Sequence, residues 1–81
     1  MYSMLILKEK SDTRVIYHYG ASQPDAPSDG EIEYLLTTNE INTLKTATYD
    51  EEGSHAIWLR THLWRTIFKE NCPPKRFVAV G

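Results

Sequence analysis

The 81-residue sequence has one cysteine, only four glycines and no long apolar run. Because Cys72 is the only cysteine, no intrachain disulfide can form, and a reducing, cytoplasmic location is expected. No apolar stretch approaches the roughly 20 residues that a membrane span needs, and the apolar run near the N-terminus is too short for a signal peptide. We therefore expect no membrane association.

The sequence also lacks the patterns of metal and catalytic sites. No Cys-x-x-Cys or His-x-x-x-His spacing occurs, and His55 and His62 would lie two helical turns apart, too far for one ion. There is no Gly-x-Ser-x-Gly motif and no glycine-rich phosphate loop. The acidic run Asp50–Glu52 before His55 is explained by a solvated helix start. These absences predict a non-enzymatic protein without metal or cofactor, with a small hydrolase or nuclease as an alternative.

Positive charge is scarce in the first two thirds of the chain. Residues 1–54 carry ten acidic and four basic side chains, whereas residues 55–81 carry one acidic and five basic ones. The simpler interpretation is that the two parts neutralise each other within one fold. The alternative is a basic contact surface in the last third, within a chain whose net charge is −2.

Three segments in the first half have the composition of strands. Tyr2–Lys10 is apolar on both faces at its centre, Arg14–Gly20 is rich in β-branched and aromatic residues, and Glu31–Leu36 alternates. The intervening loop Ala21–Gly30 is rich in proline, aspartate and serine. These segments predict a three-stranded antiparallel meander.

Two helices and a last strand are predicted in the second half. Thr37–Glu40 fits a capping box, which would begin a short helix over Thr38–Ala47. Ser54 could cap a longer helix over His55–Asn71, which the following Cys-Pro-Pro would end. The final Lys-Arg-Phe-Val-Ala-Val is typical of a strand. The expected fold is one α+β domain over residues 1–81, with βββααβ order and two layers, in which the last strand joins the same sheet.

The longer helix has a broad apolar arc that we expect to face the core. It comprises Ala56, Ile57, Leu59, Leu63, Trp64, Ile67 and Phe68. Arg60 falls near the middle of this arc. It would either pair with an acid such as Glu31 or Glu33, or pack its stem and reach water at the edge.

Trp58 is expected opposite that arc, beside His62, Arg65 and Lys69. A tryptophan flanked by basic residues suits a protein contact, or base stacking with phosphate neutralisation. The bland alternative is that the loop Ala21–Gly30 covers Trp58. We predict a small interaction module that binds another protein or itself through this helix stripe or an open sheet face. Nucleic-acid binding through the same four residues is the alternative.

The first strand favours self-association. Met4 and Ile6 point to one face of the strand, and Leu5 and Leu7 point to the other. Helices on one side of the sheet would leave the second apolar face open. A loop or a second copy of the chain could cover it, so a homodimer is expected as one solution.

Overall fold

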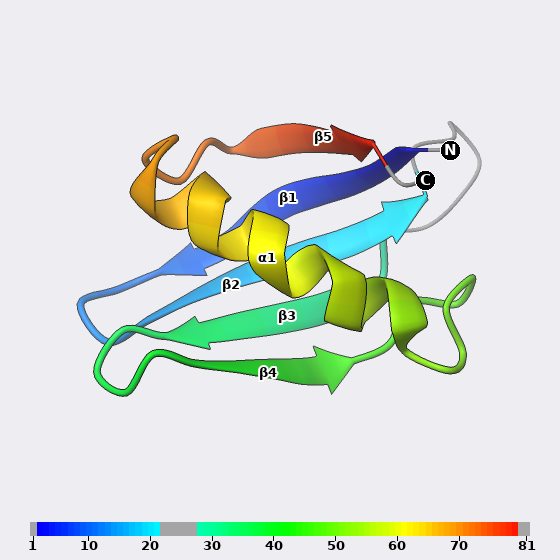
Figure 1. The fold of residues 1–81 in the computed structure, drawn as a ribbon, viewed down its shortest axis with the longest axis horizontal. Coiled ribbons are helices and arrows are strands. Elements are labelled where there is room, and N and C mark those ends of the chain that lie inside the picture. The colour runs from blue at the N-terminus through cyan, green and yellow to red at the C-terminus, as the bar shows by residue number, and fades with distance from the viewer. Residues whose placement is uncertain (1, 22–27, 80–81) are drawn as a thin grey trace.

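Four strands that follow one another in the chain pair antiparallel, and a helix then crosses one face of their sheet (Figure 1). The computed structural model describes residues 2–21 and 28–79. Their sheet has the order β4-β3-β2-β1-β5. The elements are β1 (Tyr2–Lys10), β2 (Arg14–Ala21), β3 (Gly30–Leu35), β4 (Glu40–Lys45), α1 (Ser54–Phe68) and β5 (Lys75–Ala79). The predicted α+β class is confirmed.

The predicted short helix over Thr38–Ala47 is wrong, because this segment contains the fourth strand. The supposed capping box is the β3–β4 turn, in which Asn39 has a φ of 61° and its amide donates to the Leu35 carbonyl at 2.8 Å. Ile41 and Thr43 then lie opposite Tyr34 and Ile32 of β3. An isolated helix of ten residues is marginal, whereas this strand completes a ladder and packs Ile41 on the core.

The C-terminal strand joins the sheet as predicted, and its position is at the edge beside β1. Five consecutive residue pairs from Tyr2–Ala79 to Ile6–Lys75 align β1 with β5 without a register shift. The chain reaches β5 through Asn71 and Cys72, both left-handed at φ 60° and 53°. α1 therefore ends at Phe68, three residues before the predicted end.

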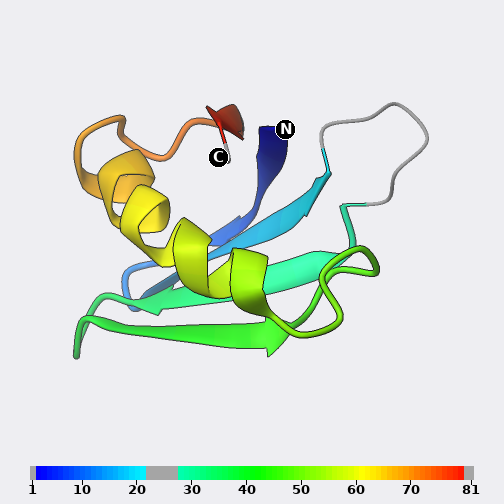
Figure 2. The same ribbon diagram turned by 45° about the vertical axis from the view of Figure 1, so that its right-hand side comes forward.

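One sheet face carries the core and is covered by α1 (Figure 2). Leu5, Tyr17, Tyr19, Ile32 and Val78 are at most 2% exposed on this face. The helix contributes four apolar core side chains, which are Ala56, Leu59, Leu63 and Ile67.

Among the described residues, no helix or strand covers the opposite face of the sheet, and its surface is divided in two. Over β2 and β3 it is charged: Lys8 pairs with Glu31 at 2.7 Å, and Arg14 pairs with Glu9 at 2.6 Å and with Glu33 at 3.2 Å.

Over β1 and β5 the same face is apolar. Met4 and Phe77 lie opposite each other in the ladder, and Ile6 lies opposite Lys75. Phe77 is 58% exposed. The predicted second apolar face of the first strand therefore exists, and it lies next to the β5 edge.

Candidate interaction surface

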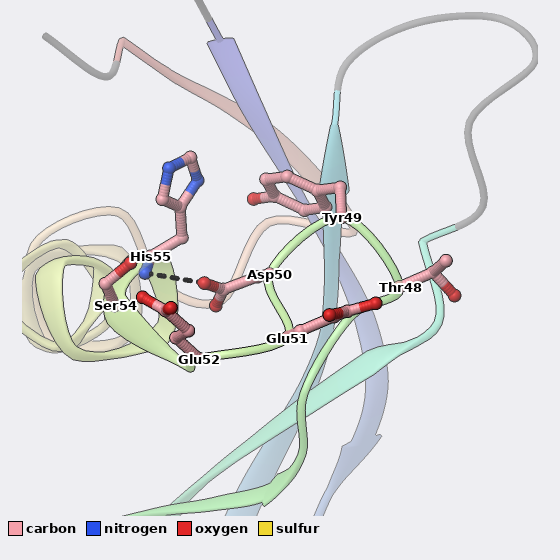
Figure 3. Close-up of a pocket in the computed structure, with 7 residues that line it drawn as sticks. All are labelled: Thr48, Tyr49, Asp50, Glu51, Glu52, Ser54 and His55. Atoms are coloured by element: carbon pink, nitrogen blue, oxygen red, sulfur yellow. Dashed lines mark hydrogen bonds between the residues drawn. The ribbon is translucent and has the colours of Figure 1, made fainter.

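The start of α1 is fixed by Asp50 rather than by the predicted Ser54 cap. One Asp50 oxygen accepts the His55 amide at 3.0 Å (Figure 3). The other oxygen accepts the Ala56 amide at 3.0 Å and the Tyr19 hydroxyl at 2.9 Å. Gly53 is the cap residue at φ 76° and offers no side chain. The Asp50 carboxylate therefore satisfies two of the free amides at the helix start.

A surface hollow of about 380 Å³ opens beside this helix start, lined by residues 48–52, Ser54 and His55 (Figure 3). Burial alone raises the pKa of Asp50, but its hydrogen bonds outweigh burial and hold the pKa below 3.8. Within the described residues, no group of histidine, cysteine and carboxylate side chains could hold a metal ion. The hollow is acidic, and its buried carboxylate is engaged in capping the helix.

The core face of α1 is narrower than the predicted arc. Its buried residues are Ala56, Leu59, Leu63, Thr66 and Ile67. Thr66 tolerates burial because its hydroxyl donates to the His62 carbonyl at 2.7 Å.

The prediction that Ile57, Trp64 and Phe68 face the core is wrong. Their side chains are 61%, 45% and 48% exposed. The helix packs the Leu59–Leu63 side of its apolar arc on the sheet. Ile57, Trp64 and Phe68, at the other edge of the arc, therefore face solvent.

These three residues lie on one side of the helix, and we call them the α1 stripe (Ile57, Trp64 and Phe68). They are spaced i, i+7 and i+11, so they share one side of the helix. The Trp64 and Phe68 ring centroids lie 5.6 Å apart. Phe68 also makes an edge contact with the core ring of Tyr34 at 5.4 Å. The stripe is thus anchored to the core at one end and exposed along its length.

The four residues predicted as a site, Trp58, His62, Arg65 and Lys69, lie along one side of α1, spaced i, i+4, i+7 and i+11. Trp58 is 38% exposed, and its ring lies 4.4 Å from that of His62 at a tilt of 33°. Lys69 instead lies over Trp64, with its Nζ 5.8 Å from the ring centroid. Arg65 is exposed on the outward side of the helix. In this structure Trp58 contacts His62, Arg65 lies close enough to His62 to affect its pKa, and Lys69 contacts Trp64, which was not among the predicted residues.

The predicted cover of Trp58 by the loop Ala21–Gly30 falls mainly on residues 22–27, which lie outside the described residues. The partners suggested for Arg60 are wrong. Glu31 and Glu33 pair with Lys8 and Arg14 on the other side of the sheet. Arg60 is half-buried, and its Nε has no hydrogen-bond partner in the described part of the chain.

The outward face of α1 carries positive charge only. No residue from Ser54 to Lys69 is acidic, while Arg65 and Lys69 are exposed. Burial, reinforced by the positive charges of Arg76 and Arg65, lowers the pKa of His62 below its ordinary 6.5. His62 is therefore neutral at pH 7 and presents an uncharged ring to Trp58.

No protein-family model, curated protein or solved structure matched the chain significantly. In the part of the chain that the structure describes, no helix is long and apolar enough to cross a membrane.

Proposed function

We propose that this chain is a small non-enzymatic interaction module that binds a partner protein through the outward face of α1. The observation that carries the proposal is the exposure of four large apolar side chains on one helix: Ile57, Trp58, Trp64 and Phe68, from 38% to 61%. A soluble protein rarely leaves such a group in water unless it binds something. Phe68 touches the core at the edge of Tyr34, but the core itself is filled by the other side of α1.

The surface suits a partner with an apolar cleft bordered by carboxylates. The spacing of the α1 stripe is that of a helix whose anchor residues enter a groove. Tryptophan and arginine are the residues that contribute most at protein interfaces, and Trp58, Trp64 and Arg65 are all present here. Arg65 and Lys69 would face acidic groups at the rim of the cleft, where they add specificity and a faster association.

Nucleic acid is less suited to this face than a protein is. Two of its most exposed side chains, Ile57 and Phe68, flank a surface with only two exposed cations, Arg65 and Lys69. The whole chain has a net charge of −2, whereas nucleic-acid domains usually have a marked basic excess.

Site-specific crosslinking in source cells tests the proposal. A photoreactive amino acid replaces Thr61, which is exposed within the outward face of α1. The matched control places it at Thr38, which is exposed in the β3–β4 turn. We expect a protein crosslinked from position 61 and absent from position 38. Crosslinks to nuclease-sensitive material from position 61 would contradict the proposal and favour nucleic acid.

Binding of the purified partner then locates the contact. Trp64→Ser should weaken binding by roughly tenfold or more, as expected for an interface anchor. Thr38→Ser is the control and should bind as the wild type does. Equal binding by Trp64→Ser, with its fold verified by circular dichroism, would remove the α1 stripe from the interface.

A further inference from the structure

We infer that the β5 edge is a self-association site, at which a second copy of this chain pairs its own β5 antiparallel to the first. This inference concerns a different surface from the proposed α1 contact and does not depend on it. It rests on the backbone of β5, on the side chains beside it, and on the contrast with the other edge of the sheet.

The free backbone groups of β5 can be assigned from its pairing with β1. The Leu7 amide donates to the Pro74 carbonyl at 2.9 Å, so residue 74 faces β1. Residues of an antiparallel strand alternate between facing one neighbour and the other. Arg76 and Val78 therefore face β1, while the amides and carbonyls of Lys75 and Phe77 point to the open edge. An added strand would find these groups without a β1 partner.

On the uncovered face this edge is apolar around Phe77, and the exposed cation Lys75 lies two residues before it. Phe77 is 58% exposed, and Met4 and Ile6 lie beside it on the neighbouring strand. Further along this face, over β2 and β3, Glu31 and Glu33 are held in ion pairs with Lys8 and Arg14. Apolar surface thus meets backbone groups that have no partner among the described residues, which is the combination that favours addition of a strand.

A second copy is the occupant that fits, because the edge is complementary to itself. A twofold axis through Phe77 would place it opposite Phe77 of the second copy, and Lys75 opposite residue 79. The cationic ends of the two strands would then lie at opposite ends of the ladder. Arg76, which would lie opposite Val78, already pairs with Glu70 at 2.7 Å. No like charges face each other in this register, and both apolar patches become continuous.

The β4 edge is built differently. The β3–β4 ladder shifts register between Glu31 and Ile32, which places an irregularity in the edge strand. Bulges of this kind protect an edge from pairing. β4 also exposes one large apolar residue, Leu44, at 49%. It therefore provides a matched control for Phe77.

Sedimentation equilibrium of the full chain over a wide concentration range tests the inference. We expect wild type to shift from one chain to two as concentration rises. Phe77→Lys should raise the dimer dissociation constant roughly tenfold or more, whereas Leu44→Lys and Trp64→Ser should dimerise as wild type does. A single-chain mass at every concentration, or a dimer lost only in Leu44→Lys, would overturn the inference.

Amide hydrogen exchange separates edge pairing from contact between sheet faces. In the β5 pair the Phe77 amide, which points away from β1, becomes hydrogen-bonded across the interface. Its exchange should therefore slow as concentration rises, while exchange at Leu44 stays unchanged. A dimer whose Phe77 amide exchanges at the same rate at every concentration would contradict the inferred geometry.

Discussion

The ring of Tyr19 lies against Gly30, directly across the β2–β3 ladder. A Cβ atom added to Gly30 would lie 2.2 Å from a ring carbon of Tyr19. Tyr19 is itself fixed: it is fully buried, its oxygen accepts the Ala47 amide at 3.0 Å, and its hydroxyl donates to Asp50. The Tyr19 side chain thus contacts the start of β3, the segment after β4 and the acid that caps α1.

Gly30→Ala should be strongly destabilising, because the ring of Tyr19 cannot move without breaking two hydrogen bonds. We expect a loss of about 1–3 kcal/mol in the free energy of unfolding, the usual range for an overpacked core. Urea unfolding followed by circular dichroism measures it. The double variant Gly30→Ala/Tyr19→Leu should lose less than the sum of the two single losses. Strict additivity would show that the ring is not what excludes the methyl group.

Asp50→Ala should destabilise the fold by about 2–3 kcal/mol, because two helix amides and the Tyr19 hydroxyl lose their acceptor. Glu51→Ala is the control, since Glu51 is exposed, and it should change stability by about 0.5 kcal/mol or less. Thermal and urea unfolding provide the measurement. Equal stability of the two variants would mean that Asp50 does not hold the start of α1.

The Asp50 contribution should also depend on pH. Its folded pKa lies below the ordinary 3.8, so the unfolded chain takes up the proton first as pH falls. The stabilisation is fully present above the ordinary pKa and is lost as pH falls through the folded pKa. The difference in unfolding free energy between wild type and Asp50→Asn should therefore be constant near neutrality and shrink below about pH 4. A difference that stays constant into the acid range would contradict this linkage.

Much of the sheet follows from local sequence: the two-faced apolar centre predicts β1, the β-branched and aromatic residues predict β2, and the alternation predicts β3. The fourth strand could not be read in the same way. Thr37–Glu40 satisfies the rules for a helix cap and for a turn, and Ile41 and Leu44 have helical spacing while Ile41 and Thr43 have strand spacing. The strand forms because β3 is available to pair with it, and this pairing is a tertiary contact that the local sequence does not show.

Asn39 distinguishes the turn from a helix by experiment. At φ 61° it is in the left-handed region, and its side chain accepts the Tyr34 hydroxyl at 3.1 Å. Asn39→Ala should therefore destabilise by about 1–2 kcal/mol, the cost of the left-handed conformation for a residue with a Cβ. Asn39→Gly should recover most of this loss. In a helix the order would reverse, with alanine more stable than glycine.

The proposed interaction surface could be located from the sequence only in part. A helix that is apolar over half its circumference can pack on the sheet in several rotations about its axis, and the sequence does not say which rotation occurs. Trp58 is exposed as the pattern predicts, but the sequence places Ile57, Trp64 and Phe68 in the core, whereas they are also exposed. Thr66 is the residue that the pattern misreads. Its hydroxyl bonds to a carbonyl of its own helix, so it can be buried, and α1 can face the sheet with its Leu59 and Leu63 side.

His62 should make stability fall in mildly acidic solution. Its folded pKa is below 6.5 because of burial and because Arg76 and Arg65 are close, so the unfolded chain binds the proton more readily. Stability should therefore decrease as pH falls through 6.5, and this loss should stop below the folded pKa. His62→Gln should remove this step while leaving the acid loss from Asp50 in place. Unfolding curves of the two proteins from pH 8 to about pH 5 measure the difference. Parallel pH profiles would show that the imidazole beside Trp58 is as easily protonated in the fold as in the unfolded chain.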